Sequence, residues 1–303
     1  KTLSELDATI LSGTQHGYFD HKGQRNSQIR TGSISEFRSL SETLTETPLM
    51  ERLHSLKLPS ISNLSENSET GNSAISPRTK FIAACIDRGL TPLPSLVMRK
   101  NFNTKINLSH FGIGDSMGCA FAECLLTLPS IESIDLCDNN LTDISLFPLI
   151  TACSRIKGLQ ELNLSRNKID AKASKALATY MSSPMCPLYR LVLDASDVDD
   201  SECAAFVECL GTNRNLHELD MSNNLLGNEE SIPGSRTGGA ALADFLVTPG
   251  CKLNYLKLAW NGIRQETAKY FAYALGKNTT LTYIDLSYNG LGFEAGEILG
   301  DSI

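Results

Sequence analysis

The sequence lacks the features that would place it in several common protein classes. Its 303 residues contain no run of 18 or more apolar residues and no apolar segment at the start, so neither a membrane-spanning helix nor a secretory signal is expected. The net charge is −7 and no basic stripe stands out, which argues against a nucleic-acid binder that relies on phosphate neutralisation. Because the first residue is Lys1, we expect the natural N-terminus to lie further upstream.

Cysteine is present, but not in the pattern of a disulfide framework. The nine cysteines are an odd number, include no CxxC pair and are not tightly clustered. Most lie in apolar stretches with helical spacing, as in Gly118-Cys119-Ala120-Phe121, where a free cysteine acts as a small hydrophobic residue. We therefore expect reduced structural thiols in an intracellular compartment.

Signatures of catalysis are few. The run Gly114-Asp115-Ser116-Met117-Gly118 fits G-x-S-x-G, but a nucleophile elbow needs a long buried strand before it and His and Asp partners. Here the run falls in a strand-to-helix turn, and none of the five histidines lies in a late Asp-x-x-His. Hydrolysis at Ser116 remains a remote alternative. The glycine and acidic runs fit neither a nucleotide loop nor an EF-hand, so no cofactor and no metal are expected.

A repeat of 28 or 29 residues, once lengthened to 37, dominates the chain from residue 103 onward. Six copies follow LxxLxLxxNxL, one of them with Ser196 in the Asn position, and they begin at Ile131, Leu159, Leu188, Leu216, Leu253 and Leu281. A degenerate first copy has Phe111 in the Asn position. Seven copies in register are a specific signal of a repeat architecture.

Each copy predicts one strand and one helix. The alternation Leu162-x-Leu164 is typical of a short strand with one buried face. The Asn turns the chain, and its amide can pair with backbone groups of the neighbouring repeat. The remaining ~15 residues have the apolar spacing of a helix. Since one repeat cannot bury its own face, we expect an α/β solenoid with parallel strands on the concave side and helices on the convex side.

This pattern is the leucine-rich repeat. A period of 28 to 29 residues with a full helix resembles the ribonuclease-inhibitor class, and the resemblance covers about two thirds of the chain. It implies a horseshoe-shaped solenoid in an intracellular protein.

The repeats define three predicted regions. Residues 1–75 form an arm with 21 Ser and Thr but only 17 Leu, Ile, Val and Phe, and short amphipathic pieces within it are expected to be held by the solenoid or a partner, or else to be a solvated linker. Residues 76–102 form a helical cap that begins at Ser76-Pro77 and stops at Gly89. Residues 103–303 hold the seven repeats, which we expect to continue beyond Ile303 or to be covered there by a partner, because solenoids need capping ends.

Two local features add to this outline. The cap run FIAACIDRGLTPLP is similar to caps of repeat proteins in flagellar and protist cytoskeletal proteomes. The lengthened repeat carries nine extra residues within 228–238, a polar loop that is either a binding element or an idle insertion.

The strand register predicts three columns of side chains on the concave face. They are Lys105, Ser133, Glu161, Arg190, Glu218, Tyr255 and Tyr283; then Asn107, Asp135, Asn163, Val192, Asp220, Lys257 and Asp285; and then His110, Asp138, Arg166, Ala195, Asn223, Trp260 and Tyr288. Adjacent strands lie about 4.8 Å apart, so the four aromatic side chains should form one patch. We predict partner-binding residues in this patch and in the charged middle: Trp260, Tyr288, Tyr255, Tyr283, Arg166, Arg190, Glu161, Glu218 and Asp220. Simple packing of the rings against each other at the C-terminal end is the alternative.

These observations favour a non-catalytic scaffold that binds a protein partner of some basic character on its concave face and rim. Such a protein would be cytoplasmic, or a structural subunit of a cytoskeletal or ciliary assembly, with no nucleic-acid or membrane partner. The alternative is a regulator of GTPases, because Ran GTPase-activating proteins use a similar repeat solenoid. Arg166 and Arg190 are the only arginines on the predicted face.

Overall fold

The computed structural model describes residues 76–93, 104–128, 130–227 and 236–302. The predicted arm, residues 94–102 of the cap and most of the inserted loop lie outside these residues. The chain divides into two units between Asn72 and Ser73, and the described residues all belong to the second unit, Ser73–Ile303.

Seven short strands form one parallel sheet in the order of the sequence. They are β1 Lys105–Asn107, β2 Ser133–Asp135, β3 Glu161–Asn163, β4 Arg190–Val192, β5 Glu218–Asp220, β6 Tyr255–Lys257 and β7 Tyr283–Asp285. Each strand pairs with the next in the register that the repeat predicts, for example Ile106 with Ile134 and Leu256 with Ile284. The middle residue of each strand points into the core, and the two outer residues point away from it.

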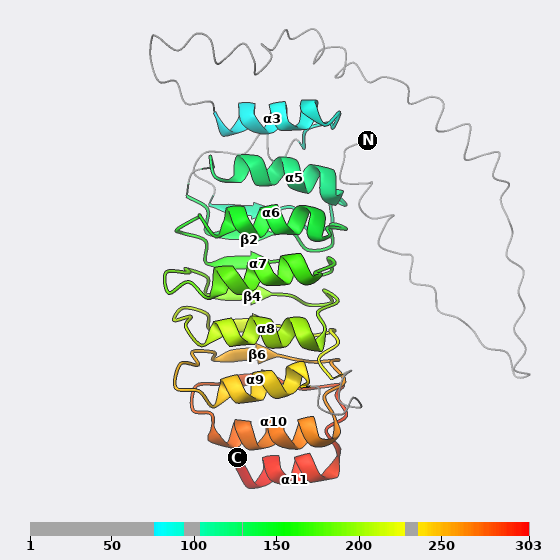
Figure 1. The fold of residues 1–303 in the computed structure, drawn as a ribbon, viewed down its shortest axis with the longest axis vertical. Helices are drawn as coiled ribbons and strands as arrows, with labels where there is room; N and C mark the ends of the chain where they lie inside the picture. The colour runs from blue at the N-terminus through cyan, green and yellow to red at the C-terminus, as the bar shows by residue number, and fades with distance from the viewer. Residues whose placement is uncertain (1–75, 94–103, 129, 228–235, 303) are drawn as a thin grey trace, which may run out of the picture. The chain divides into compact units, whose positions relative to one another are not determined.

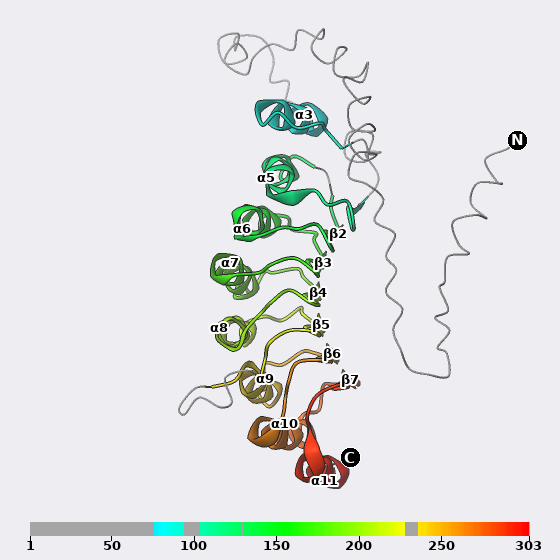
Figure 2. The same ribbon diagram turned by 90° about the vertical axis from the view of Figure 1, so that its right-hand side faces the viewer.

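A helix follows each strand. The helices are α5 Gly114–Leu125, α6 Asp143–Cys153, α7 Ala171–Met181, α8 Asp200–Leu210, α9 Gly238–Leu246, α10 Gln265–Lys277 and α11 Gly292–Ser302. Figure 1 shows them stacked side by side in front of the sheet. In Figure 2 the helices follow the outer side of the curve and the strands follow the inner side, as the repeat pattern predicts.

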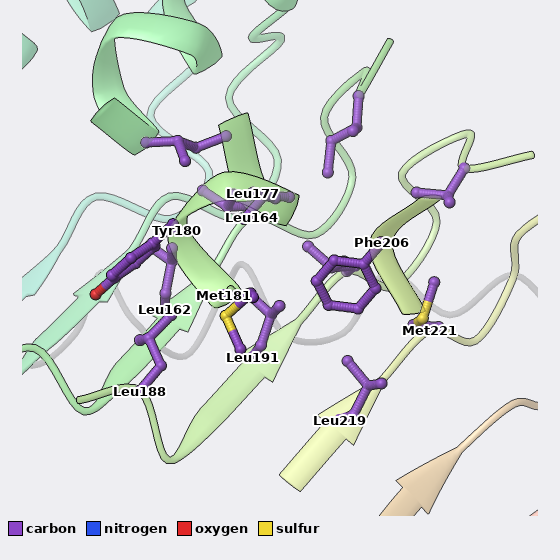
Figure 3. Close-up of a cluster of buried hydrophobic side chains, with 14 of the residues drawn as sticks. Leu162, Leu164, Leu177, Tyr180, Met181, Leu188, Leu191, Phe206, Leu219 and Met221 are labelled. Atoms are coloured by element: carbon purple, nitrogen blue, oxygen red, sulfur yellow. The ribbon is translucent and has the colours of Figure 1, made fainter. Parts of the chain in front are cut away.

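The core lies between the sheet and the helices and runs through all the repeats. Figure 3 shows its middle, where Leu162 and Leu191 of the strands meet Met181 and Phe206 of the helices. Six of the nine cysteines are buried and all nine are free thiols, which fits their predicted role as small apolar residues. Burial raises the pKa of Cys153 to about 12, so this thiol stays protonated at neutral pH.

The N-terminal cap begins with the predicted helix, α3 Pro77–Asp87. The Ser76 hydroxyl accepts a hydrogen bond from the Thr79 N–H at 3.2 Å, and Pro77 occupies the first helical position. Gly89 has a φ of 65°, a left-handed conformation that ends a helix and suits glycine. Phe81 and Cys85 are buried as predicted, whereas Ile82 is only half-buried and Ala84 takes its place in the core.

Buried asparagines join neighbouring repeats along the turn that follows each strand. The Asn167 amide nitrogen donates to the carbonyl oxygens of Leu136 at 2.9 Å and Leu164 at 3.0 Å. Its side-chain oxygen accepts from the N–H groups of Asn139 at 3.2 Å and Leu141 at 3.0 Å. The predicted role of this position in the leucine-rich repeat is thereby confirmed.

A second inter-repeat link lies at the beginning of the helices. The Asp115 carboxylate accepts hydrogen bonds from the Thr142 N–H at 2.8 Å and the Ser145 hydroxyl at 2.6 Å. One repeat later, Asp143 accepts from the N–H groups of Lys172 and Ala173 at 2.9 Å each. A carboxylate in one repeat therefore caps the helix of the next, where the helix dipole favours negative charge.

The last repeat is less buried than those before it. Leu253, Leu256 and Leu258 are fully covered, while their counterparts Leu281, Ile284 and Leu286 are only partly covered. Within the described ranges, no helix has both the length and the apolar composition needed to cross a bilayer.

Candidate functional site

The concave face carries the three predicted columns of side chains. The strand pairing places Glu161 beside Arg190, Glu218 beside Tyr255, and Tyr255 beside Tyr283. Because this register follows from the buried leucines, the same residues that build the core fix which side chains meet on the surface.

Four aromatic rings stack as two pairs in the register that the sequence predicts, and we call Trp260, Tyr288, Tyr255 and Tyr283 the aromatic patch. The rings of Tyr255 and Tyr283 stack with 4.2 Å between centroids and 8° between planes, and those of Trp260 and Tyr288 stack at 4.3 Å and 10°. The exposed fraction is 55% for Trp260, 69% for Tyr288 and 43% for Tyr283. Large exposed rings held in a fixed arrangement are typical of interaction surfaces.

The backbone of the third column is strained in every repeat. Its seven residues all have a φ between 51° and 62°: His110, Asp138, Arg166, Ala195, Asn223, Trp260 and Tyr288. In this left-handed region asparagine and aspartate are tolerated, whereas bulky residues are outliers. Trp260 and Tyr288 therefore occupy positions for which folding alone would not select them.

The charges beside the aromatic patch are partly neutralised. The Lys257 ammonium lies 3.7 Å from the Asp220 carboxylate and 5.6 Å from the centroid of the Tyr255 ring. Burial lowers the pKa of Lys257, but the attraction of Asp220 together with the neighbouring phenols of Tyr255 and Tyr283 outweighs it, and the pKa is raised. The nearby phenol of Tyr255 raises the pKa of Tyr283, so the Tyr283 phenol stays neutral at physiological pH.

The predicted charged residues do not form one cluster. Arg190 pairs with Glu218 at 3.6 Å, and Glu161 accepts a hydrogen bond from the Ser133 hydroxyl at 3.1 Å. Arg166 is exposed at the turn after β3. Together with Asp220, these residues line the middle of the face beside the aromatic patch, and their partner-binding role stays a prediction.

One further aromatic stack was not predicted. Tyr189 and His217, each just before its strand, stack at 4.9 Å with 17° between planes. They line a shallow hollow of about 450 Å³ with Lys157 and Gln160. The same register that predicts the aromatic patch could have revealed this stack, because the two residues occupy equivalent positions of adjacent repeats.

Ser116 lacks the setting of a nucleophile elbow. It lies exposed in the first turn of α5, and the strand before it has three residues. The two described histidines are engaged elsewhere, since the His110 ring pairs with Asp138 at 2.8 Å and the His217 ring with the Asn215 carbonyl at 2.6 Å. Among the residues placed by the structure, no three His, Cys, Asp or Glu side chains gather into a metal site.

Comparison with known proteins agrees with this geometry. A family model described as "Leucine Rich repeat" matches residues 159–178 and 277–297. The chain is 32% identical over 174 residues to "NACHT, LRR and PYD domains-containing protein 5" of Mus musculus, covering 57% of this chain and 14% of that protein. It is 29% identical over 164 residues to "Ribonuclease inhibitor" of Mus musculus, covering 54% of this chain and 34% of that protein.

The chain thus spans only a minor part of the length of these relatives. The solved structure "Leiomodin-1 Actin-Binding Site 2 (ABS2)" aligns with 60% of this chain and 86% of that chain at 14% identity, with a TM-score of 0.36. The repeat register, the matched segments and the named relatives together show that this chain is a leucine-rich repeat protein of the ribonuclease-inhibitor-like class.

Proposed function

We propose that this chain is a non-catalytic protein-interaction scaffold that binds a partner on its concave face. The observation that carries the proposal is the aromatic patch, whose rings stack in pairs on β6 and β7 and on the turns that follow these strands. Rings that are already ordered lose little conformational entropy on binding, which is why such residues contribute strongly to protein interfaces. Curved repeat surfaces are also typical binding surfaces of solenoids.

The charge of the face favours a partner with basic character. Six side chains of the three columns are acidic and four are basic: Asp135, Asp138, Glu161, Glu218, Asp220 and Asp285 against Lys105, Arg166, Arg190 and Lys257. A basic partner would be attracted by this excess and then anchored on the aromatic patch. The Tyr189–His217 stack and the hollow that it lines add a binding surface in the middle repeats.

The cellular setting is the second part of the proposal. We place the protein in the cytoplasm because its nine cysteines are free thiols, six of them buried. A cytoskeletal or ciliary assembly rests only on the similarity of the cap sequence.

Affinity purification with mass spectrometry tests the main proposal. The bait is the full chain, and the comparison is a Trp260→Ala/Tyr288→Ala variant whose thermal unfolding is measured alongside. The expected result is one or more proteins with basic surfaces that the wild type captures and the variant loses, at an unchanged melting temperature. Equal capture by both baits, or stimulation of GTP hydrolysis by the wild-type chain in a GTPase assay, would contradict the proposal.

A further inference from the structure

The outer surface of α6 is apolar although it faces solvent. After Asp143 this helix has no charged residue, and its inner face supplies Leu146, Leu149 and Ile150 to the core. On its outer side Ile144 is 70% exposed and Phe147 is 49% exposed. We call these two residues the α6 patch. A helix that is apolar on all sides is normally covered on all sides.

The fold itself does not require these apolar residues. The equivalent positions, 28 residues later in α7, are Lys172 and Lys175, and both lysines are exposed. The equivalent positions in α5 are Ser116 and Cys119. Since neighbouring repeats fold with polar or small residues at these places, the apolar side chains of α6 need another explanation.

The charged side chains on the two sides of the α6 patch differ in whether other described residues already pair with them. On the α5 side, Glu123 pairs with Arg88, and Asp115 caps the next helix. On the α7 side, no ion pair between described residues engages the ammonium of Lys172 or Lys175. The backbone N–H of Lys172 bonds to Asp143 at 2.9 Å, so α7 begins directly beside the start of α6. Figure 1 shows α5, α6 and α7 side by side.

We propose that the α6 patch binds an amphipathic helix of a partner protein, with the acidic flank of that helix lying over Lys172 and Lys175. Neighbouring helices pack with axes about 8–10 Å apart, so a partner helix resting on α6 brings one of its flanks over α7. Its apolar residues at i, i+3, i+4 and i+7 would contact Ile144 and Phe147. This surface lies on the helical side, opposite the sheet, and does not depend on the function proposed for the concave face.

Two designed peptides test the proposal on the full chain. Both are fluorescein-labelled 18-residue helices with leucines at i, i+3, i+4 and i+7, and they differ only in having glutamates or lysines along one flank. Fluorescence anisotropy should show at least tenfold tighter binding of the glutamate peptide, and this preference should shrink at high salt. Equal binding of the two peptides, or binding of neither, would overturn the proposal.

Two variants assign the binding to this surface. Ile144→Lys/Phe147→Lys copies the residues of α7, so it should fold with unchanged circular dichroism and lose at least tenfold in affinity for the glutamate peptide. Lys172→Glu/Lys175→Glu should reverse the preference towards the lysine peptide. Trp260→Ala/Tyr288→Ala is the matched control, and it should bind the glutamate peptide as the wild type does.

Other occupants give distinct results in the same experiments. If the chain self-associates in sedimentation experiments and Ile144→Lys/Phe147→Lys abolishes this association, the occupant of the α6 patch is a second copy of this chain and not a partner helix. If the chain binds vesicles of phosphatidylserine and phosphatidylcholine and shows no preference between the two peptides, the occupant of the α6 patch is a membrane surface. Either result would overturn the proposal, as would full retention of peptide binding by the Ile144→Lys/Phe147→Lys variant.

Discussion

Trp260 stacks on Tyr288 at 4.3 Å between ring centroids, and both residues hold a left-handed backbone, with φ of 57° and 56°. The stack and the backbone have opposite effects on stability. A left-handed conformation costs a non-glycine residue about 1–2 kcal/mol, and an aromatic pair contributes about 0.5–1.5 kcal/mol beyond the area it buries. The two rings therefore add little net stability to the fold, which agrees with the partner-binding role that we propose for them.

The first prediction follows from this balance. Trp260→Asn should change the free energy of unfolding by less than about 1 kcal/mol, because asparagine relieves the backbone strain while the stack is lost. Asn223 already occupies the equivalent position of the preceding repeat. Urea denaturation followed by circular dichroism measures the change.

Trp260→Val is the matched control. It also removes the stack, but a β-branched residue tolerates a positive φ poorly, so it should be less stable than Trp260→Asn by about 1 kcal/mol. A loss of several kcal/mol in the asparagine variant would instead mean that the indole is part of the core.

The repeat pattern predicts the fold well because a single physical cause recurs in every copy. Leu162 and Leu164 must be buried on one face, and a 28-residue period places each such pair beside the next. The strand register, the buried asparagines and the α3 cap all follow from sequence spacing. The Tyr255–Tyr283 and Trp260–Tyr288 contacts follow in the same way, since strand spacing brings equivalent residues together.

Other features depend on contacts that a repeat period does not encode. The pairing of Lys257 with Asp220 depends on side-chain rotamers across two strands. The exposure of Ile144 and Phe147 depends on how α6 packs between its neighbours. From the sequence alone, apolar residues in a helix are normally assigned to the core. The linking role of Asp115 requires knowing which helix start lies beside its carboxylate.

The second prediction concerns the buried asparagines that link repeats. Asn167→Ala should lower the free energy of unfolding by about 3 kcal/mol, because it leaves two N–H groups and several carbonyl oxygens without their partner. Asn167→Ser should lose about half as much. Serine occupies this position in the following repeat, where the Ser196 hydroxyl donates to the Leu164 and Asp194 carbonyl oxygens at 3.4 and 3.3 Å. Equal losses in urea denaturation of the two variants would contradict this role of the amide.

The third prediction is a pH dependence at Asp115. Burial raises the pKa of this carboxyl, but hydrogen bonds from Ser145 and Thr142 outweigh it and hold the pKa below the ordinary value for aspartate. The ionised form therefore stabilises the folded chain at neutral pH. As the pH falls below about 4, the unfolded chain takes up the proton first, and this contribution is lost as the pH passes through the lowered pKa.

Asp115→Asn should reveal that contribution. The variant should be less stable than the wild type at pH 7, and the difference should shrink towards zero between about pH 4 and pH 2. Asp87→Asn, at the exposed end of α3, is the control and should show a smaller difference at pH 7. Denaturation midpoints measured across this range decide the matter, and a difference that stays constant with pH would count against the assigned role.

The fourth prediction explains the last glycine of the G-x-S-x-G run. Gly118 lies where α5 meets α6, and a Cβ atom there would lie 2.8 Å from the Cβ of Ser145 and 3.1 Å from Leu141 Cδ2. Gly118→Ala should therefore destabilise the chain by about 1–3 kcal/mol, although alanine is the better helix former.

Gly296→Ala is the matched substitution within α11, because no described atom lies within 4 Å of the added Cβ there. It should stabilise the chain by up to about 1 kcal/mol through helix propensity alone. Urea denaturation of the two variants should thus give changes of opposite sign. A stabilising Gly118→Ala would mean that α5 and α6 can separate without cost, and the glycine would then need an explanation other than close packing.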